Sequence, residues 1–176
     1  YRDSKYECAD ASSSAITLRC YSNDGSLHVT PYSHLYVRVK FGSNTYRQRA
    51  SRNQECIFTH DGNLNDTETY IYSADCISDI GDLSPFRVGM VNVAAATKLQ
   101  RLILGSSAEG YRNLTFEGIS VGTNELLSEV NIENCLIDYT KHSSAGTINF
   151  SNCHGLETVK AKGSNIKSLI LPDGGH

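Results

Sequence analysis

The chain has 176 residues, of which 39% are hydrophobic and 20% are charged, with a formal net charge of -3 and a pI near 6.1. These values are ordinary for a globular protein, and no apolar run approaches the roughly 20 residues that a membrane-spanning helix needs. The charge gives no general attraction to phosphate backbones. We therefore expect neither membrane insertion nor a nucleic-acid partner.

Residues 1–70 contain short runs with period-two alternation, divided by turn sequences such as NDG, SNT and HDGN. This pattern is typical of β-strands. In HLYVRVKF, one set of alternating residues is apolar and the other is polar, so one face meets a core and the other meets water. The apolar set is Leu35, Val37, Val39 and Phe41, and the polar set is His34, Tyr36, Arg38 and Lys40. We predict a small immunoglobulin-like β-sandwich or barrel over residues 1–70.

The second half contains an internal repeat. VNIENC, which begins at Val130, returns as INFSNC, which begins at Ile148. Both belong to a longer template: an apolar residue, two free positions, apolar-x-apolar, two free positions, and a small residue, Asn or Cys. The matched sets are Val88, Val91, Val93, Ala96; Leu99, Leu102, Leu104, Ser107; Phe116, Ile119, Val121, Asn124; Leu127, Val130, Ile132, Cys135; Ala145, Ile148, Phe150, Cys153; Leu156, Val159, Ala161, Ser164; and Ile166, Leu169, Leu171, Gly174.

Every second start, at residues 88, 116, 145 and 166, begins a new coil, so the coils are 28, 29 and 21 residues long. A period of roughly 20 to 50 residues indicates a solenoid, and L-x-x-L-x-L-x-x-N/C is the strand unit of leucine-rich repeats. One coil cannot bury its own apolar face, so the coils must stack. We predict a mainly β protein in which residues 99–176 form a leucine-rich-repeat-like β-solenoid. Residues 71–98, broken by Gly81, Pro85 and Gly89, lead into the coils and cap them.

The far end of the array, after SLILPDGG, contains no recognisable cap. We expect either further coils in a longer parent protein or a partner on that edge, which would include a second copy of the chain. Leu102, Val130, Ile148 and Leu169 should be buried in the stack.

Two polar insertions, AEGYRN and DYTKHSS, lengthen the coils and should form surface loops on one side of the stack. Exposed tyrosines are favoured at recognition surfaces. The candidate binding residues are therefore Tyr111, Arg112, Tyr139 and Lys141. Tyr32, Tyr36, Tyr46, Tyr70 and Tyr72 lie in or beside strand-like runs and are expected to be sheet residues.

Six cysteines are present and no C-x-x-C pair occurs among them. The repeated Asn-Cys ending of VNIENC and INFSNC is best interpreted as part of the structural repeat, in which Asn124 or Cys135 points inward. A disulfide and a metal site are the less favoured alternatives. We expect Cys135 and Cys153 to stay reduced. The pattern does not decide whether Cys8, Cys20, Cys56 and Cys76 form disulfides.

His60 beside Asp61 could act in acid-base chemistry or bind a metal, but Asp-Gly favours a hairpin turn here. Two acidic segments could supply oxygens to Ca²⁺, yet neither has a known calcium-loop spacing, so solvated loops are favoured. Their residues are Asp79 and Asp82, and Asn63, Asn65, Asp66 and Glu68. No hydrolase, protease or P-loop motif is present. We predict no enzyme activity, no cofactor and no metal, with the His60–Asp61 neighbours as the one weak argument for an enzyme.

Residues 70–175 contain GDLSP, ATKLQRLILG, GYRN, SVGTNELL and coils ending in NC. In this combination the segment resembles the leucine-rich-repeat-like arrays of large virion proteins from gut bacteriophages, including crAss-like phages. The resemblance implies a structural or host-contact role in the virion, with other virion proteins as partners and no catalytic residues. A secreted or surface-anchored bacterial leucine-rich-repeat adhesin that binds a host protein or glycan is the alternative.

Overall fold

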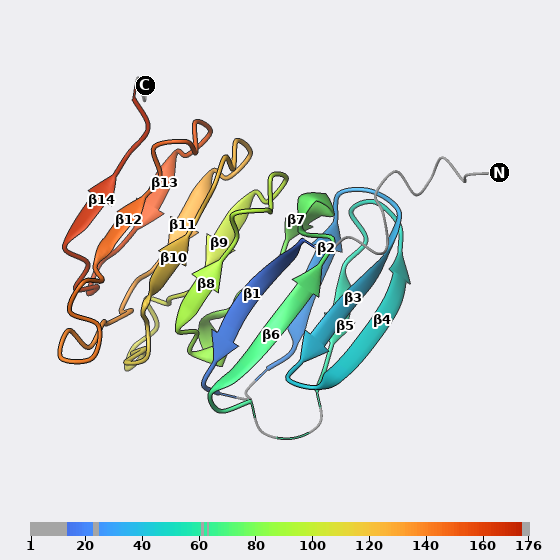
Figure 1. Ribbon diagram of the computed structural model, residues 1–176, viewed down its shortest axis with the longest axis horizontal. Coiled ribbons are helices and arrows are strands. Elements are labelled where there is room, and N and C mark those ends of the chain that lie inside the picture. The colour runs from blue at the N-terminus through green and yellow to red at the C-terminus, as the bar shows by residue number, and fades with distance from the viewer. Residues whose placement is uncertain (1–13, 23–24, 61, 63, 174–176) are drawn as a thin grey trace.

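The computed structural model describes residues 14–22, 25–60, 62 and 64–173, without the side chain of Leu35. Its described part is mainly β, with two single-turn 3₁₀ helices, η1 (Ala74–Cys76) and η2 (Ser84–Phe86). The strands are β1 (Ala15–Cys20), β2 (Leu27–Pro31), β3 (Leu35–Phe41), β4 (Asn44–Ala50), β5 (Cys56–Phe58), β6 (Thr67–Tyr72), β7 (Ile77–Asp79), β8 (Met90–Asn92), β9 (Arg101–Ile103), β10 (Gly118–Ser120), β11 (Glu129–Asn131), β12 (Thr147–Asn149), β13 (Thr158–Lys160) and β14 (Ser168–Ile170). They form two layers along an elongated molecule (Figure 1).

The first six strands form where alternation predicts them. β1, β6, β3 and β4 are neighbours in one antiparallel sheet, and β5, β2 and β7 form a second antiparallel sheet. Alternate residues are buried in β1 and β3: Ile16, Leu18 and Cys20 of β1 are buried, as are Val37, Val39 and Phe41 of β3. The apolar sets of both sheets belong to one core.

The connections at the Asp-Gly sequences differ from the hairpins expected there. β5 and β6 lie in different sheets, and so do β1 and β2. Each connection therefore crosses from one layer to the other instead of joining paired strands. Asp61 and Asn63 lie outside the described residues, as do Asn23 and Asp24. β3 and β4 are joined by a tight hairpin in which Phe41 pairs with Asn44, and Gly42 has φ +58°.

The second half consists of short strands that pair in parallel. β9, β11 and β13 form one ladder in which Leu102 pairs with Val130 and Val130 with Val159. β10 pairs with β8 through Ile119 and Val91, β12 pairs with β14, and β12 lies beside β10. The short turns between the ladders lie along the upper edge of Figure 1 and the longer loops along the lower edge. The chain thus returns to the neighbouring position in the stack after 28 or 29 residues, and after 21 residues between β12 and β14.

The two halves share their sheets. β1 pairs with β6 on one side and with β8 on the other, where Leu18 lies opposite Val91. In the other layer, β7 pairs with β2, and Gln100 N–H, next to β9, donates to Ser78 O at 2.9 Å. The boundary expected at residue 70 falls inside β6, and segment 71–98 adds strands to both layers. The first coil is therefore covered by β1 beside β8 and by residues 78–83 of segment 71–98 beside β9, and β2 in turn covers β7.

The template positions form the core of the stack. Leu102 and Val130 are fully inaccessible and Ile148 is 1% exposed, as expected. The prediction that Leu169 is buried is wrong: it is only partly buried, because the described chain places no further coil over it. Ser107 is exposed, because the chain leaves the core after Gly105 and enters the loop that follows β9. Gly174 lies outside the described residues.

Buried asparagines close the bends of the coils. Asn124 is fully buried, and its Nδ2 donates to Val93 O at 2.9 Å and to Ala96 O at 2.8 Å, in the preceding coil. Asn113 is equally buried and donates to Val88 O at 2.8 Å. These amides satisfy backbone carbonyls that the short strands leave unpaired. The inward orientation predicted for Asn124 and Cys135 is confirmed, since Cys135 is also fully buried.

Candidate binding surfaces

The first insertion is tied to the coils by its tyrosine. Tyr111 is half-buried, its hydroxyl donates to Ser84 O at 2.8 Å, and the Arg87 guanidinium lies 4.2 Å from its ring centroid. Burial raises the pKa of Tyr111. Arg87 Nε also donates to Arg112 O at 3.1 Å, while the Arg112 residue is exposed. Tyr111 thus orders the loop, and Arg112 is the more accessible of the two candidates.

Tyr139 has an equivalent place in the second insertion. Its hydroxyl donates to Asn165 O at 2.7 Å, and Lys167 Nζ lies 4.2 Å from its ring centroid. The loop is held further by Asp138, which accepts hydrogen bonds from the backbone and hydroxyl of Thr140, and these bonds lower the pKa of Asp138. Tyr139 therefore joins this loop to the last coil.

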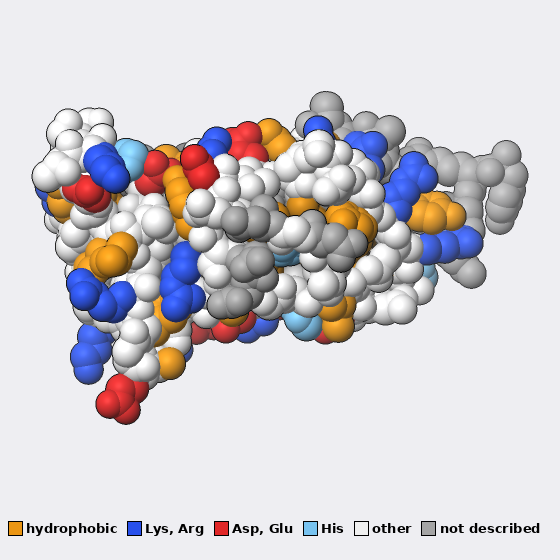
Figure 2. Space-filling view, turned by 90° about the horizontal axis from the view of Figure 1, so that it is seen from below, with side chains coloured by type: hydrophobic (Ala, Val, Ile, Leu, Met, Phe, Trp, Pro, Cys, Tyr) orange, Lys and Arg blue, Asp and Glu red, His pale blue; other side chains and the backbone are white. Residues whose placement is uncertain are grey.

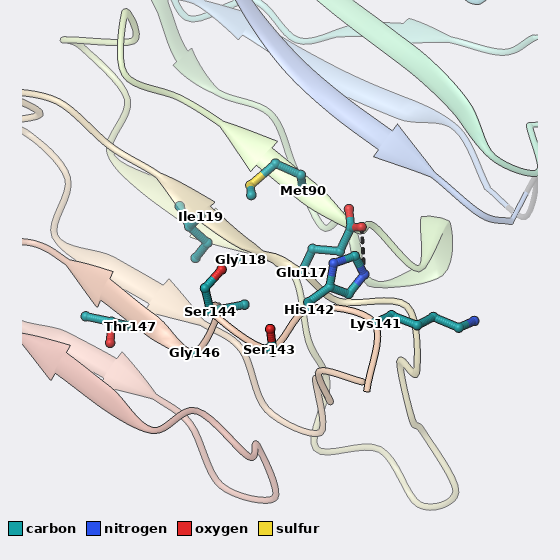
Figure 3. A pocket seen from close by; sticks show the side chains of 11 residues that line it. Met90, Glu117, Gly118, Ile119, Lys141, His142, Ser143, Ser144, Gly146 and Thr147 are labelled. Carbon is teal, nitrogen blue, oxygen red and sulfur yellow. Dashed lines mark ion pairs between the residues drawn. The ribbon is translucent and has the colours of Figure 1, made fainter. Parts of the chain in front are cut away.

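Beside the second insertion lies a hollow of about 450 Å³. Its floor is formed by β8 and β10 and its wall by residues 141–147 (Figure 3). Gly118 has φ +147° and contributes no side chain to the floor of the hollow. A Cβ at this position would have only the end of Met90 within 4 Å, at 3.8 Å. Lys141 belongs to the rim, and its side chain extends away from Ile119 and Ser144.

His142 and Glu117 are paired at the mouth of this hollow, with Nε2 and Oε1 3.0 Å apart. A second hollow of about 130 Å³ lies against the same pair and includes Tyr21 and Leu114. Hydroxyls of Ser143, Ser144 and Thr147 line the first hollow together with apolar Met90 and Ile119. Such a lining can hydrogen-bond and cover a small polar group such as one sugar unit. Reasoning from local sequence patterns misses this hollow, because Glu117 and His142 are 25 residues apart.

A different surface lies on the outer face of β3, β4 and β6. Arg38 of β3 pairs in register with Arg47 of β4, and its guanidinium lies 4.0 Å from the ring centroid of Tyr72 on β6. Lys40, two residues along β3, lies 5.8 Å from the ring centroid of Tyr70. Figure 2 shows basic and hydrophobic-class side chains together at the end of the molecule that β3 and β4 form. This surface, made of Arg38, Lys40, Arg47, Arg49, Tyr70 and Tyr72, is called the basic face below.

The carboxylates proposed as possible Ca²⁺ ligands make internal contacts. Asp79 Oδ2 accepts from Arg101 Nε at 2.7 Å, and Asp82 Oδ1 accepts from the Ser84 backbone at 2.9 Å. Asp66 pairs with Arg19 at 2.7 Å, and Glu68 accepts from the Tyr70 hydroxyl at 2.6 Å, which raises the pKa of Tyr70. Asn65 is exposed, and Asn63 lies outside the described residues. The described residues contain no group of three or more His, Cys, Asp and Glu that could hold a metal ion.

His60 contacts the ring of Phe41, with centroids 5.3 Å apart, and its Nδ1 is buried without a hydrogen-bond partner among the described residues. Asp61 lies outside them. The thiols of Cys20, Cys56, Cys135 and Cys153 are free and buried, and Cys76 is disulfide-bonded. Cys8 lies outside the described residues. Burial raises the pKa of Cys20 to about 11 and that of Cys135 to about 12, so both thiols are protonated at neutral pH.

The described residues contain no helix long and apolar enough to cross a membrane. No protein-family model matches the chain, and no curated protein and no solved structure matches it either.

Proposed function

We propose that this chain is a non-enzymatic structural and binding module of a phage virion. In this proposal the N-terminal sheets are an immunoglobulin-like β-sandwich, and the parallel strands are a leucine-rich-repeat-like solenoid. The 28- and 29-residue spacing of paired strands supports the solenoid interpretation. The virion setting is supported by the resemblance of residues 70–175 to phage arrays.

The observation that supports an assembly role best is the open end of the stack. Within the described part of the chain, β13 and β14 each have a strand on one side only. Ile170 is 44% exposed and Leu171 is 55% exposed at this end. Unpaired strand edges beside apolar side chains favour contact with another protein, and isolated solenoids normally cover such an end. We propose that another protein surface covers it: further coils of a longer parent protein, a neighbouring virion protein or a second copy of this chain.

The insertion loops lie along one edge of the stack (Figure 1), and the second of them contacts the last coil through Tyr139. In this proposal the loops and the hollow beside His142 contact another partner. Hydroxyls, an ion pair and two apolar side chains suit a glycan, which is consistent with host recognition. The same features suit a bacterial adhesin. Whether the chain belongs to a virion or to a cell surface must therefore be tested separately from glycan binding.

Particles from the source culture can be purified on a density gradient and compared with the cell-envelope fraction by quantitative mass spectrometry. Peptides of this chain should co-sediment with the particles, at a constant ratio to the major capsid protein across the particle peak. A known envelope protein of the host is the matched control for contamination. Peptides that follow the envelope protein instead would support the adhesin and overturn the virion proposal.

A further inference from the structure

We propose that the basic face binds an acidic polysaccharide, one whose sugars bear carboxylate or sulfate groups. The proposal rests on the binding role proposed above and names the ligand class and the surface. This surface is separate from the insertion loops.

The face concentrates positive charge in a chain that is negative overall. Arg38 and Lys40 alternate along β3, and Arg47 and Arg49 alternate along β4. Alternate residues of a strand lie about 7 Å apart on one face and neighbouring strands lie about 4.8 Å apart, so the four cations form a compact lattice. A linear polymer with regularly placed acidic groups complements such a lattice.

These cations have few acidic neighbours. In the described part of the chain, no carboxylate forms an ion pair with Arg38, Lys40 or Arg47. The nearest acidic residues on the adjoining strands, Asp66 and Glu68, are paired with Arg19. Arg38 Nε is moreover buried without a hydrogen-bond partner among the described residues. The face therefore presents charge that an external anion can neutralise.

The tyrosines favour an acidic glycan over a nucleic acid. A nucleic acid would stack its bases on open aromatic rings. Here the Tyr72 ring is covered by Arg38, at 4.0 Å, and Tyr70 and Tyr72 stack on each other with centroids 6.2 Å apart. The Tyr72 ring in this arrangement holds the Arg38 guanidinium in place, and a fixed guanidinium suits the two oxygens of a carboxylate or sulfate.

The test is binding of the full chain to defined oligosaccharides, measured by titration calorimetry at two salt concentrations. The probes are oligogalacturonate, a heparin-derived oligosaccharide, neutral dextran and a single-stranded oligonucleotide. We expect at least one acidic glycan to bind with an affinity that falls as salt rises, and dextran to give no signal. An oligonucleotide that binds as tightly as the better glycan would overturn the proposal in favour of unspecific polyanion binding.

Paired variants locate the site. Arg38→Gln with Arg47→Gln should weaken glycan binding about a hundredfold, about tenfold for each charged pair lost. Lys160→Gln with Lys162→Gln removes the same charge from two exposed residues at and beside β13 and should leave affinity unchanged. The opposite result would place binding on the coils and contradict the proposal.

Arg38 packs on Tyr72, so replacing it can disturb the fold as well as the charge. Arg47 is exposed, and Arg47→Lys is therefore a second variant that should keep the fold. It retains the charge but loses the planar fork, and so should bind the glycan more weakly than wild type. Wild-type affinity in this folded variant would also count against the proposal. A chain that co-sediments with particles but binds no acidic glycan would refute this inference alone.

Discussion

Asn165 exchanges two hydrogen bonds with the backbone of Ile137, one coil earlier. Its Nδ2 donates to Ile137 O at 2.8 Å and its Oδ1 accepts from Ile137 N–H at 2.8 Å. The Asn165 side chain thus makes the two backbone hydrogen bonds that a neighbouring strand would otherwise make with Ile137. Together with the Tyr139 hydroxyl on Asn165 O, it attaches the last coil to the loop.

Asn165→Ala should destabilise the last coil, because it leaves the buried Ile137 N–H and C=O without partners. The expected cost is about 1–3 kcal/mol, and hydrogen exchange of β13 and β14 should quicken. Asn152→Ala is the control, since Asn152 is exposed and makes no side-chain hydrogen bond with described residues. Equal exchange in the two variants would refute this role for Asn165.

Truncating the stack should cost more in its middle than at its open end. Leu102→Ala should lower the free energy of unfolding by about 2–5 kcal/mol, because Leu102 is fully buried. Leu169→Ala should cost clearly less, because Leu169 is only partly buried. Urea unfolding of both variants measures the difference. Similar costs would mean that the last coil is covered.

Gly105 should not tolerate a side chain. A Cβ at this position would overlap Glu133 O of the next coil, and the obstacle is backbone that cannot turn away. Gly105→Ala should therefore destabilise the fold by about 1–3 kcal/mol or more. Ser107→Ala, two residues along on the exposed loop, is the control and should be near neutral by thermal unfolding. A harmless Gly105→Ala would contradict the close approach of these coils.

Stability should fall in alkali, partly because of Cys135. Burial raises the pKa of this thiol to about 12 from its ordinary value of 9.0. The unfolded thiol loses its proton first, so the stability contribution is complete below about pH 9 and is lost as pH rises toward about 12. Cys135→Ala should unfold with a shallower pH dependence than wild type in urea titrations at about pH 8 and about pH 10.5. Ser107→Ala, which removes no titrating group, is the control, and parallel curves for wild type and Cys135→Ala would argue against this coupling.

The open end should be needed for assembly but not for folding. Ile170→Asp with Leu171→Asp should abolish retention of particle proteins by the immobilised chain, while the melting temperature stays within a few degrees of wild type. Ile57→Asp changes a residue of equal character, 50% exposed on β5, and should retain those proteins. Loss of retention in Ile57→Asp alone would move the contact to the N-terminal sheets.

Local periodicity predicts the strands and most of the core, because alternation and the coil template depend on neighbours in sequence. It finds Val37 and Val39 as well as Leu102 and Val130. It cannot find the pairing of Leu18 with Val91, since nothing in either strand specifies a partner so far along the chain. For the same reason it predicts segment 71–98 as a cap but misses β1, although both lie against the first coil: β1 lies beside β8, and residues 78–83 lie beside β9.

The candidate surfaces divide in the same way. The polar set of β3, including Arg38 and Lys40, is evident from alternation. The placement of Arg38 beside Arg47 and Tyr72 depends on strand order and register, which the alternation within one strand does not specify. The His142–Glu117 pair likewise exists only once an insertion loop lies against a neighbouring coil. Tyr111 and Tyr139 were expected to serve binding, but their hydroxyls are bonded to backbone carbonyls.

Cryo-electron microscopy of the intact source particle would decide whether this chain is a virion component. We expect copies of this chain at symmetry-related positions on the particle, with β13 and β14 against a neighbouring protein and the basic face exposed. Particles without such density, together with flexibly tethered copies on the host envelope, would contradict the virion assignment. Ordered copies whose β13 and β14 face solvent would contradict assembly through the open end.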